Sequence, residues 1–182
     1  MINKNSNTKL HFIHTPKCAG SYASNILKDL KIHNMGHNQA IKNKNIINFT
    51  IIRDPIERYE SLLNYRLNRI RPDSDWPKHL HYVYKNKNIT LNEIVSQMND
   101  SEILGFYPYN TLIYWSKNID IFITIDQLEK FLSFFGYNYD KNNYNKINVS
   151  NKIRGTFNDE TRERLKKLYN DDILFFNKVI HK

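Results

Sequence analysis

The sequence predicts an α/β fold in which helices flank a central, mainly parallel sheet in three layers. Short apolar runs rich in β-branched residues alternate along the chain with amphipathic stretches of helical period. The run over Ile46–Ile52 is almost wholly apolar, which is typical of a parallel strand buried on both faces. The chain has only five Gly and five Pro, so we expect each of them to mark a definite turn.

The first third of the chain contains three expected strands and one expected helix. Lys9–His14 and Ile46–Ile52 are apolar enough for buried strands, and Lys31–Met35 can form a short strand between them. The segment from Ser21 to about Leu30 has helical character, and Ser21 is placed to cap its start. This alternation predicts parallel strands joined by crossover helices.

A second helix is expected directly after the last of these strands. Asp54 can cap it, Pro55 fits its first turn, and its pattern continues to about Arg69. Arg58 is expected to be a solvated residue of this helix. The segment Arg69–Asn88 has no clear period and is rich in Arg, Lys, His, Trp and Tyr, so we expect a long loop there.

The second half of the chain continues the alternation. Thr90 and Glu93 form a capping-box pattern, Gly136 suits the end of a helix, and Asn158 or Asp159 suits the start of the last one. The expected elements are a helix over 91–98, a strand over Ile119–Ile125, a helix over 126–135, a polar loop over 137–155 and one long helix over 160–179.

Composition and charge indicate one globular domain with anionic partners. The 182 residues, 40% of them hydrophobic, suffice for a single domain over residues 1–182. The net charge of +9 favours nucleotides, nucleic acid or acidic glycans as partners. A single cysteine, Cys18, excludes an intramolecular disulfide. The chain shows no signal-peptide pattern and no apolar run of about 20 residues, so we expect a soluble, intracellular protein without stable membrane insertion.

Two turns that follow expected strands carry basic residues. The first, in FIHTPKCAG, joins the Lys9–His14 strand to a helix and holds Lys17 among small residues. A strand, a Lys-bearing turn and a helix N-terminus together can bind phosphate through backbone N–H groups. The second turn begins with Arg53, whose planar guanidinium suits a phosphate. Because the carboxyl ends of parallel strands meet at one edge of a sheet, both turns are expected to face one ligand.

These two turns resemble the nucleotide-binding motifs of sulfotransferases. FIHTPKCAGSYASNIL resembles the 5′-phosphosulfate loop of that family, usually written P-K-T-A-G-T-S, and FTIIRDPIERYESLLNYR is similar to its 3′-phosphate segment. INVSN and the tail ETRERLKKLYNDDILFF are also family-like. The best match is the carbohydrate branch, which includes the heparan and chondroitin sulfotransferases.

The resemblance implies a P-loop-like fold and a defined reaction. The donor would be 3′-phosphoadenosine 5′-phosphosulfate, the product adenosine 3′,5′-bisphosphate, and the acceptor a hydroxyl group, with a carbohydrate expected. The transferred sulfuryl group carries less negative charge than a phosphoryl group, so no metal ion is expected.

The resemblance also implies roles for particular residues. Lys17 lies beside the bridging oxygen that becomes the leaving group, so it is both a donor-binding and a catalytic residue. Arg53 and Ser61 hold the 3′-phosphate, and Ser150 and Arg154 lie where the family closes a loop over the nucleotide. The 5′-phosphosulfate is cradled by the backbone amides of Cys18, Ala19, Gly20, Ser21 and Tyr22.

Cys18 and Tyr22 depart from the family motif. Cys18 stands where Thr is usual, and Tyr22 stands where a small hydroxyl residue is common. We interpret Cys18 as a small filler, because a phosphatase loop of the form C-x-x-x-x-x-R would need Arg where this chain has Ser24.

Transfer to a hydroxyl also requires a general base, and His37 is the candidate. A histidine suits this role because its free pKa is about 6.5. His37 follows the expected short strand and should emerge at the carboxyl edge of the sheet, whereas His14 is expected to be a spacer. Some glycan sulfotransferases that this sequence resembles have a catalytic His in the corresponding segment and others use Glu, so Glu57 and Glu60 are the alternatives.

Two other functions could use the same basic features. A degenerate P-loop kinase would bind ATP and Mg²⁺, but it needs Ser or Thr at the position after the loop lysine, where this chain has Cys18. It also needs an acidic residue at the end of a strand to bind Mg²⁺, and Asp126 is the only candidate. A non-enzymatic binder of nucleotides or nucleic acid would need clustered basic residues, whereas here they are scattered, so we expect no nucleic-acid partner. The acceptor is expected to meet the Arg69–Asn88 loop, whose cations and rings suit a polar or anionic glycan.

Overall fold

The computed structural model describes residues 9–38, 40–68, 76–86, 88–105, 111–144 and 154–180. Within them, a four-stranded sheet has the order β2-β1-β3-β4. Its strands are β1 (Lys9–Ile13), β2 (His33–Asn34), β3 (Ile46–Ile51) and β4 (Ile121–Ile123). All three pairings are parallel. The expected α/β fold with a parallel sheet is therefore confirmed.

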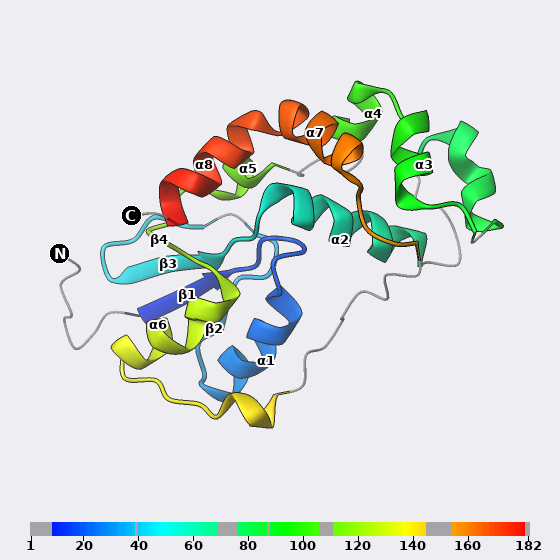
Figure 1. The fold of residues 1–182 in the computed structure, drawn as a ribbon. Coiled ribbons are helices and arrows are strands. Elements are labelled where there is room, and N and C mark those ends of the chain that lie inside the picture. The colour runs from blue at the N-terminus through cyan, green and yellow to red at the C-terminus, as the bar shows by residue number, and fades with distance from the viewer. Residues whose placement is uncertain are drawn as a thin grey trace.

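Helices cover both faces of this sheet (Figure 1). On one face lie α1 (Gly20–Asp29) and α6 (Leu128–Phe134), and over the other lie α2 (Pro55–Leu67), α5 (Leu112–Trp115) and α8 (Asn170–Ile180). Phe12 of β1 and Phe49 of β3 have 0% exposure in the core between these layers. β3 is buried on both faces, and its two polar residues, Asn48 and Thr50, are buried with their side chains hydrogen-bonded to backbone carbonyls.

A second core lies beyond the sheet, around α2. It gathers side chains from η1 (Lys78–Tyr84), α3 (Leu91–Gln97) and α7 (Asp159–Leu168), with α4 (Asp100–Gly105) beside them. Tyr59 and Leu63 of α2 are buried in this core. The helix that follows the Arg53 turn is thus fixed by packing along its whole length.

Several local signals are confirmed. Asp54 caps α2 by accepting hydrogen bonds from the N–H groups of Ile56 and Glu57 at 3.0 and 2.9 Å. The capping box of Thr90 and Glu93 opens α3 as expected.

Three expectations about secondary structure are corrected. The final helix is divided, because Tyr169, only 4% exposed, turns into the second core and donates its hydroxyl to the Ile103 carbonyl at 3.2 Å. The Arg69–Asn88 segment contains η1, with Leu80 and Val83 buried, while residues 69–75 and 87 lie outside the described residues. The strand expected over Ile119–Ile125 is only β4, and one 3-10 turn, η2 (Ile125–Gln127), precedes α6.

The polar segment before the last helices contains one further turn, η3 (Lys141–Asn143). In the ranges given above, no helix combines the length and the apolar character that crossing a bilayer requires.

Candidate functional site

The Lys17 turn lies at the carboxyl end of β1 and leads into α1. This helix begins at Gly20, with Ala19 as its N-cap in the left-handed conformation at φ 61° and ψ 21°. No side chain caps the helix, so the cap expected from Ser21 is wrong, and Ser21 lies in the first turn instead. Among the described residues, the N–H groups of Gly20 and Tyr22 have no acceptor. An uncapped helix N-terminus is a ready binding site for an anion.

The backbone of this turn is strained in a way that favours anion binding. Lys17 and Ala19 have φ values of 62° and 61°, which non-glycine residues seldom adopt, whereas Cys18 between them does not. Such alternation points successive N–H groups to one side and forms a concave anion-binding nest. Each left-handed residue costs on the order of 1–3 kcal/mol, so the surrounding structure must hold the turn in place.

Arg58 is one of the residues that hold it. Its side chain is only 3% exposed and its Nε donates to the Pro16 carbonyl at 2.8 Å, so the expectation of a solvated Arg58 is wrong. Cys18, 1% exposed, faces the backbone N–H of Arg53 and the Arg58 side chain. Burial raises the pKa of the Cys18 thiol, and the positive charges of Arg58 and Arg53 offset part of the rise. Cys18 is therefore a protonated, buried side chain, as its interpretation as a filler requires.

Gly20 is required by space rather than by its backbone angles. A Cβ added at Gly20 would lie 1.8 Å from both Cδ2 and Nε2 of His14. His14 is therefore packed against the start of α1 and is more than a spacer. Burial, followed by the charges of His37 and Lys17, lowers the pKa of His14 to about 4. At neutral pH a neutral imidazole thus lies beside the loop.

His37 lies where its position after the short strand predicted. The strand β2 ends at Asn34, and the Gly36 carbonyl accepts a hydrogen bond from the His14 N–H at 2.8 Å, which brings this turn beside the end of β1. The rings of His37 and His14 stack with centroids 4.2 Å apart, and the Trp115 ring lies 6.0 Å from that of His37. His37 is exposed, so its free ring edge can meet a ligand.

The hydrogen bond of His37 also sets its tautomer. Its Nδ1 lies 2.9 Å from the His14 carbonyl oxygen. A carbonyl oxygen only accepts, so Nδ1 carries the hydrogen and Nε2 of the neutral ring is left as the acceptor. His37 therefore has the tautomer that a general base needs.

One exposed face of α2 continues the site from the second turn. Glu57, Ser61 and Tyr65 follow one another at four-residue intervals and so lie on one side of the helix. The Tyr65 ring, 45% exposed, holds the Lys17 ammonium 4.1 Å from its centroid. The Ser61 hydroxyl is half-buried and has no hydrogen-bond partner in the described part of the chain. The structure therefore brings Lys17 to the same face of α2 as Ser61.

Arg53 lies just before this face and is close enough to Lys17 to affect it. Burial and then the positive charge of Arg53 lower the pKa of Lys17. Two cations held near one another repel each other, and an anion bound to both would relieve the repulsion. This arrangement is the electrostatic signature of an anion site.

The existing partners of both cations are weak enough to be replaced. Arg53 Nε binds the Glu57 carboxylate at 3.1 Å, and this is the pairing that would make Arg53 merely structural. Both side chains are exposed, and an exposed pair of this kind contributes only about 0.3–0.5 kcal/mol. The contact of Lys17 with an exposed ring contributes about 0.5–1 kcal/mol. A charged hydrogen bond to phosphate contributes about 1.5–3 kcal/mol, so a phosphate would prevail over either partner.

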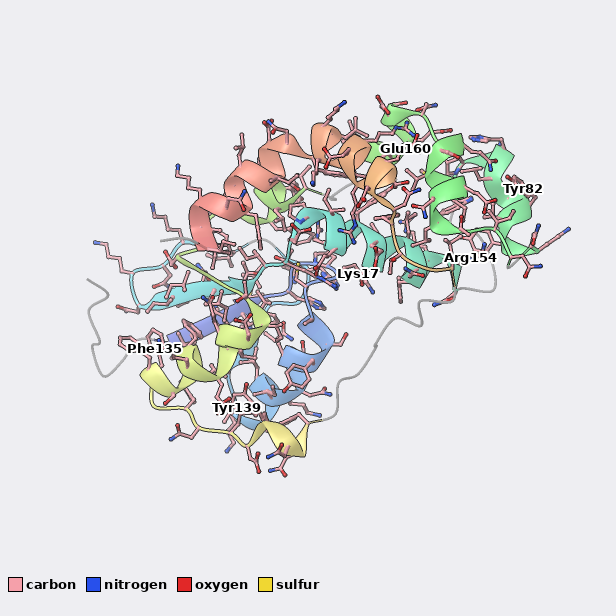
Figure 2. The ribbon with its side chains drawn as sticks, in the orientation of Figure 1. Lys17, Tyr82, Phe135, Tyr139, Arg154 and Glu160 are labelled. Carbon is pink, nitrogen blue, oxygen red and sulfur yellow. The ribbon has the colours of Figure 1, made fainter. Side chains whose placement is uncertain are left out.

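Arg154 is not part of this arrangement. Figure 2 shows it toward the far end of α2, well separated from Lys17. Arg154 is 5% exposed, and its guanidinium donates to the carbonyls of Asn86, Ile89 and Val83 at 3.2, 3.2 and 2.7 Å. Because its donors are used within the protein, the structure gives Arg154 a structural role and we leave it out of the site. Ser150 lies outside the described residues.

Sequence reasoning missed Arg58, His14 and Tyr65 as members of this site. A signal for Arg58 was present, because four-residue spacing places it on the same side of the helix as the buried Leu62. No local sequence pattern indicates a role for His14 or Tyr65. The role of His14 comes from its packing against Gly20, and that of Tyr65 from its contact with Lys17.

The fold and the site define an α/β protein with a candidate anion-binding site at the carboxyl edge of its sheet. No family model and no curated protein matches this chain. In the residues that the structure describes, no three His, Cys, Asp or Glu side chains are grouped in a way that could hold a metal ion.

Proposed function

We propose that this chain is a sulfotransferase that moves a sulfuryl group from 3′-phosphoadenosine 5′-phosphosulfate to a hydroxyl acceptor, which is expected to be a carbohydrate. The observation that carries the proposal is that two cationic, anion-binding turns leave the adjacent parallel strands β1 and β3. The register pairs Ile13 with Thr50, so both strands end at the same level. A donor with two separate anionic ends fits two such turns.

The residues of this chain divide the donor between them. The uncapped N-terminus of α1 and the Lys17 turn suit the 5′-phosphosulfate, and Arg53 with the unpartnered Ser61 hydroxyl suits the 3′-phosphate. The donor supplies the sulfuryl group that is transferred. Lys17 exchanges its contact with Tyr65 for the bridging oxygen and stabilises the negative charge that develops there.

His37 acts as the general base in this proposal. Its Nε2 accepts the proton of the acceptor hydroxyl as that oxygen attacks in line with the departing phosphate. The bond from Nδ1 to the His14 carbonyl holds the ring in the required tautomer, and the stacked His14 ring fixes its orientation. His14 is therefore a positioning residue for the base.

A thermal-shift experiment with three ligands tests the proposal. We expect adenosine 3′,5′-bisphosphate to raise the Tm without added metal, because the site supplies its own cations. Stabilisation by ATP with Mg²⁺ alone would instead favour a kinase, and stabilisation by an oligonucleotide alone would favour a nucleic-acid binder. Sulfate transfer to a panel of glycans, phenols and peptides would then identify the acceptor.

A further inference from the structure

Arg58 is a buried cation that the proposed mechanism does not use. Its side chain is 3% exposed in the middle of the site, although a guanidinium is always charged and is costly to bury without partners. Its Nε donates to the Pro16 carbonyl at 2.8 Å, and its charge acts on the buried thiol of Cys18. Arg58 therefore contacts the loop on both sides of Lys17.

The charge of Arg58 also acts on a buried acid. Asp172 of α8 is 2% exposed, and its carboxylate accepts hydrogen bonds from the N–H groups of Leu112 and Ile113 at 2.7 and 3.2 Å. Burial raises the pKa of Asp172, while those two N–H groups and the charge of Arg58 act against the rise. Arg58 thus contacts the loop and acts electrostatically on the C-terminal helix, two parts of the chain that are far apart in sequence.

The loop needs such an anchor because its conformation is unfavourable by itself. Lys17 and Ala19 are both left-handed, and neither is glycine. Pro16 is fixed by Arg58, and Cys18 is fixed by Arg58 and the Arg53 N–H, so the strained Lys17 is held between two anchored neighbours. We infer that Arg58 is the clamp that keeps the phosphate loop in its anion-binding shape, joining it to α2, the helix that carries Ser61 and directly follows the Arg53 turn. The assignment of a ligand to the loop rests on the proposed function, but the clamp itself does not.

The single cysteine of the chain provides a direct report of the clamp. Cys18 is 1% exposed, so a thiol reagent reaches it only when the loop opens. We expect an aromatic disulfide reagent to label Arg58→Gln at least about tenfold faster than the wild type, in buffer without denaturant, because the loop opens without global unfolding.

Arg66→Gln is the matched control. Arg66 is on the same helix, two turns further on, and is also buried at 5% exposure, but it is not among the groups that act on Cys18. Unfolding free energies of all variants are measured in urea, so that labelling through global unfolding can be subtracted. After that subtraction, Arg66→Gln should be labelled at the wild-type rate. Equal labelling of the two variants would overturn the clamp.

A second variant keeps the inference testable if Arg58→Gln does not fold. Arg58→Lys keeps the charge but loses the Nε–H that binds Pro16. We expect its Cys18 to be labelled faster than in the wild type and in Arg66→Gln, and labelling at the wild-type rate would refute the role of that hydrogen bond.

A ligand arm separates this inference from the proposed function. Adenosine 3′,5′-bisphosphate should slow the labelling of wild-type Cys18. A lack of protection would count against the proposed donor site. The labelling rates measured without ligand would still test whether Arg58 clamps the loop. In Arg58→Gln we expect affinity for the bisphosphate to fall at least about tenfold. Adenosine 3′-monophosphate has no 5′-phosphate to contact the loop, so it should bind this variant as it binds the wild type. An equal loss for both ligands would show a general distortion rather than a loop clamp.

Discussion

Gly20→Ala tests the packing at the centre of the site. The new Cβ would lie 1.8 Å from Cδ2 and Nε2 of the His14 ring, whereas ordinary contacts are about 3.5 Å, so the ring must retreat by roughly 1.7 Å. The ring cannot retreat freely, because it is stacked on His37 with centroids 4.2 Å apart. Overpacking of this kind costs about 1–3 kcal/mol, and the better helix propensity of Ala returns about 0.5–1 kcal/mol. We expect a net loss of about 1–2 kcal/mol.

Urea unfolding of a double-mutant cycle measures this coupling. In the His14→Ala background the ring is gone, so Gly20→Ala should be neutral or slightly stabilising there. In the wild-type background it should lower the unfolding free energy by about 1–2 kcal/mol, which corresponds to a fall of roughly 2–8 °C in a separately measured Tm. The same penalty in both backgrounds would refute the contact between Gly20 and His14.

Three further predictions concern individual side chains. His37→Ala should lower kcat by about 100-fold or more with little change in donor affinity, whereas near-normal turnover together with inactive Glu57 or Glu60 variants would move the base to α2. His14 has a folded pKa of about 4, below its unfolded value of 6.5, so the unfolded chain binds the proton first as pH falls. Urea unfolding at several pH values should therefore show about 3 kcal/mol of stability lost between roughly pH 6.5 and 4, and His14→Gln should lack this loss. Arg154→Ala should lower the unfolding free energy by about 3 kcal/mol, since one buried and two part-buried carbonyls lose their donor, and a selective loss of donor affinity instead would restore Arg154 to the site.

The parts of the fold that sequence could predict are those set by local chemistry. The apolar run at β3 and the Asp54 cap of α2 are specified by neighbouring residues alone, and both are confirmed. The placement of the Lys17 and Arg53 turns at one edge follows from the rule for parallel strands, which needs only the order of the elements.

The predictions that were wrong concern features that depend on contacts between segments distant in sequence. Arg58 is bound to the Pro16 carbonyl, 42 positions away along the chain, and the structural role of Arg154 depends on carbonyls of η1 and its neighbouring turn. Tyr169 divides the final helix because it is drawn into the second core. Periodicity reports which face of a helix is apolar, but it does not report which charged side chain finds a buried partner on that face.

The central claim is that Lys17 and Arg53 hold the two ends of one nucleotide, and calorimetric titration with adenosine 3′,5′-bisphosphate in metal-free buffer tests it most directly. We expect the wild type to bind, and Lys17→Ala and Arg53→Ala each to bind ten- to a hundredfold more weakly, which corresponds to about 1.5–3 kcal/mol for one charged hydrogen bond. Ser61→Ala should lose less, and Lys28→Ala, an exposed lysine at the other end of α1, should bind as the wild type does. Absence of binding by the wild type, or wild-type affinity in both the Lys17 and the Arg53 variant, would contradict the account.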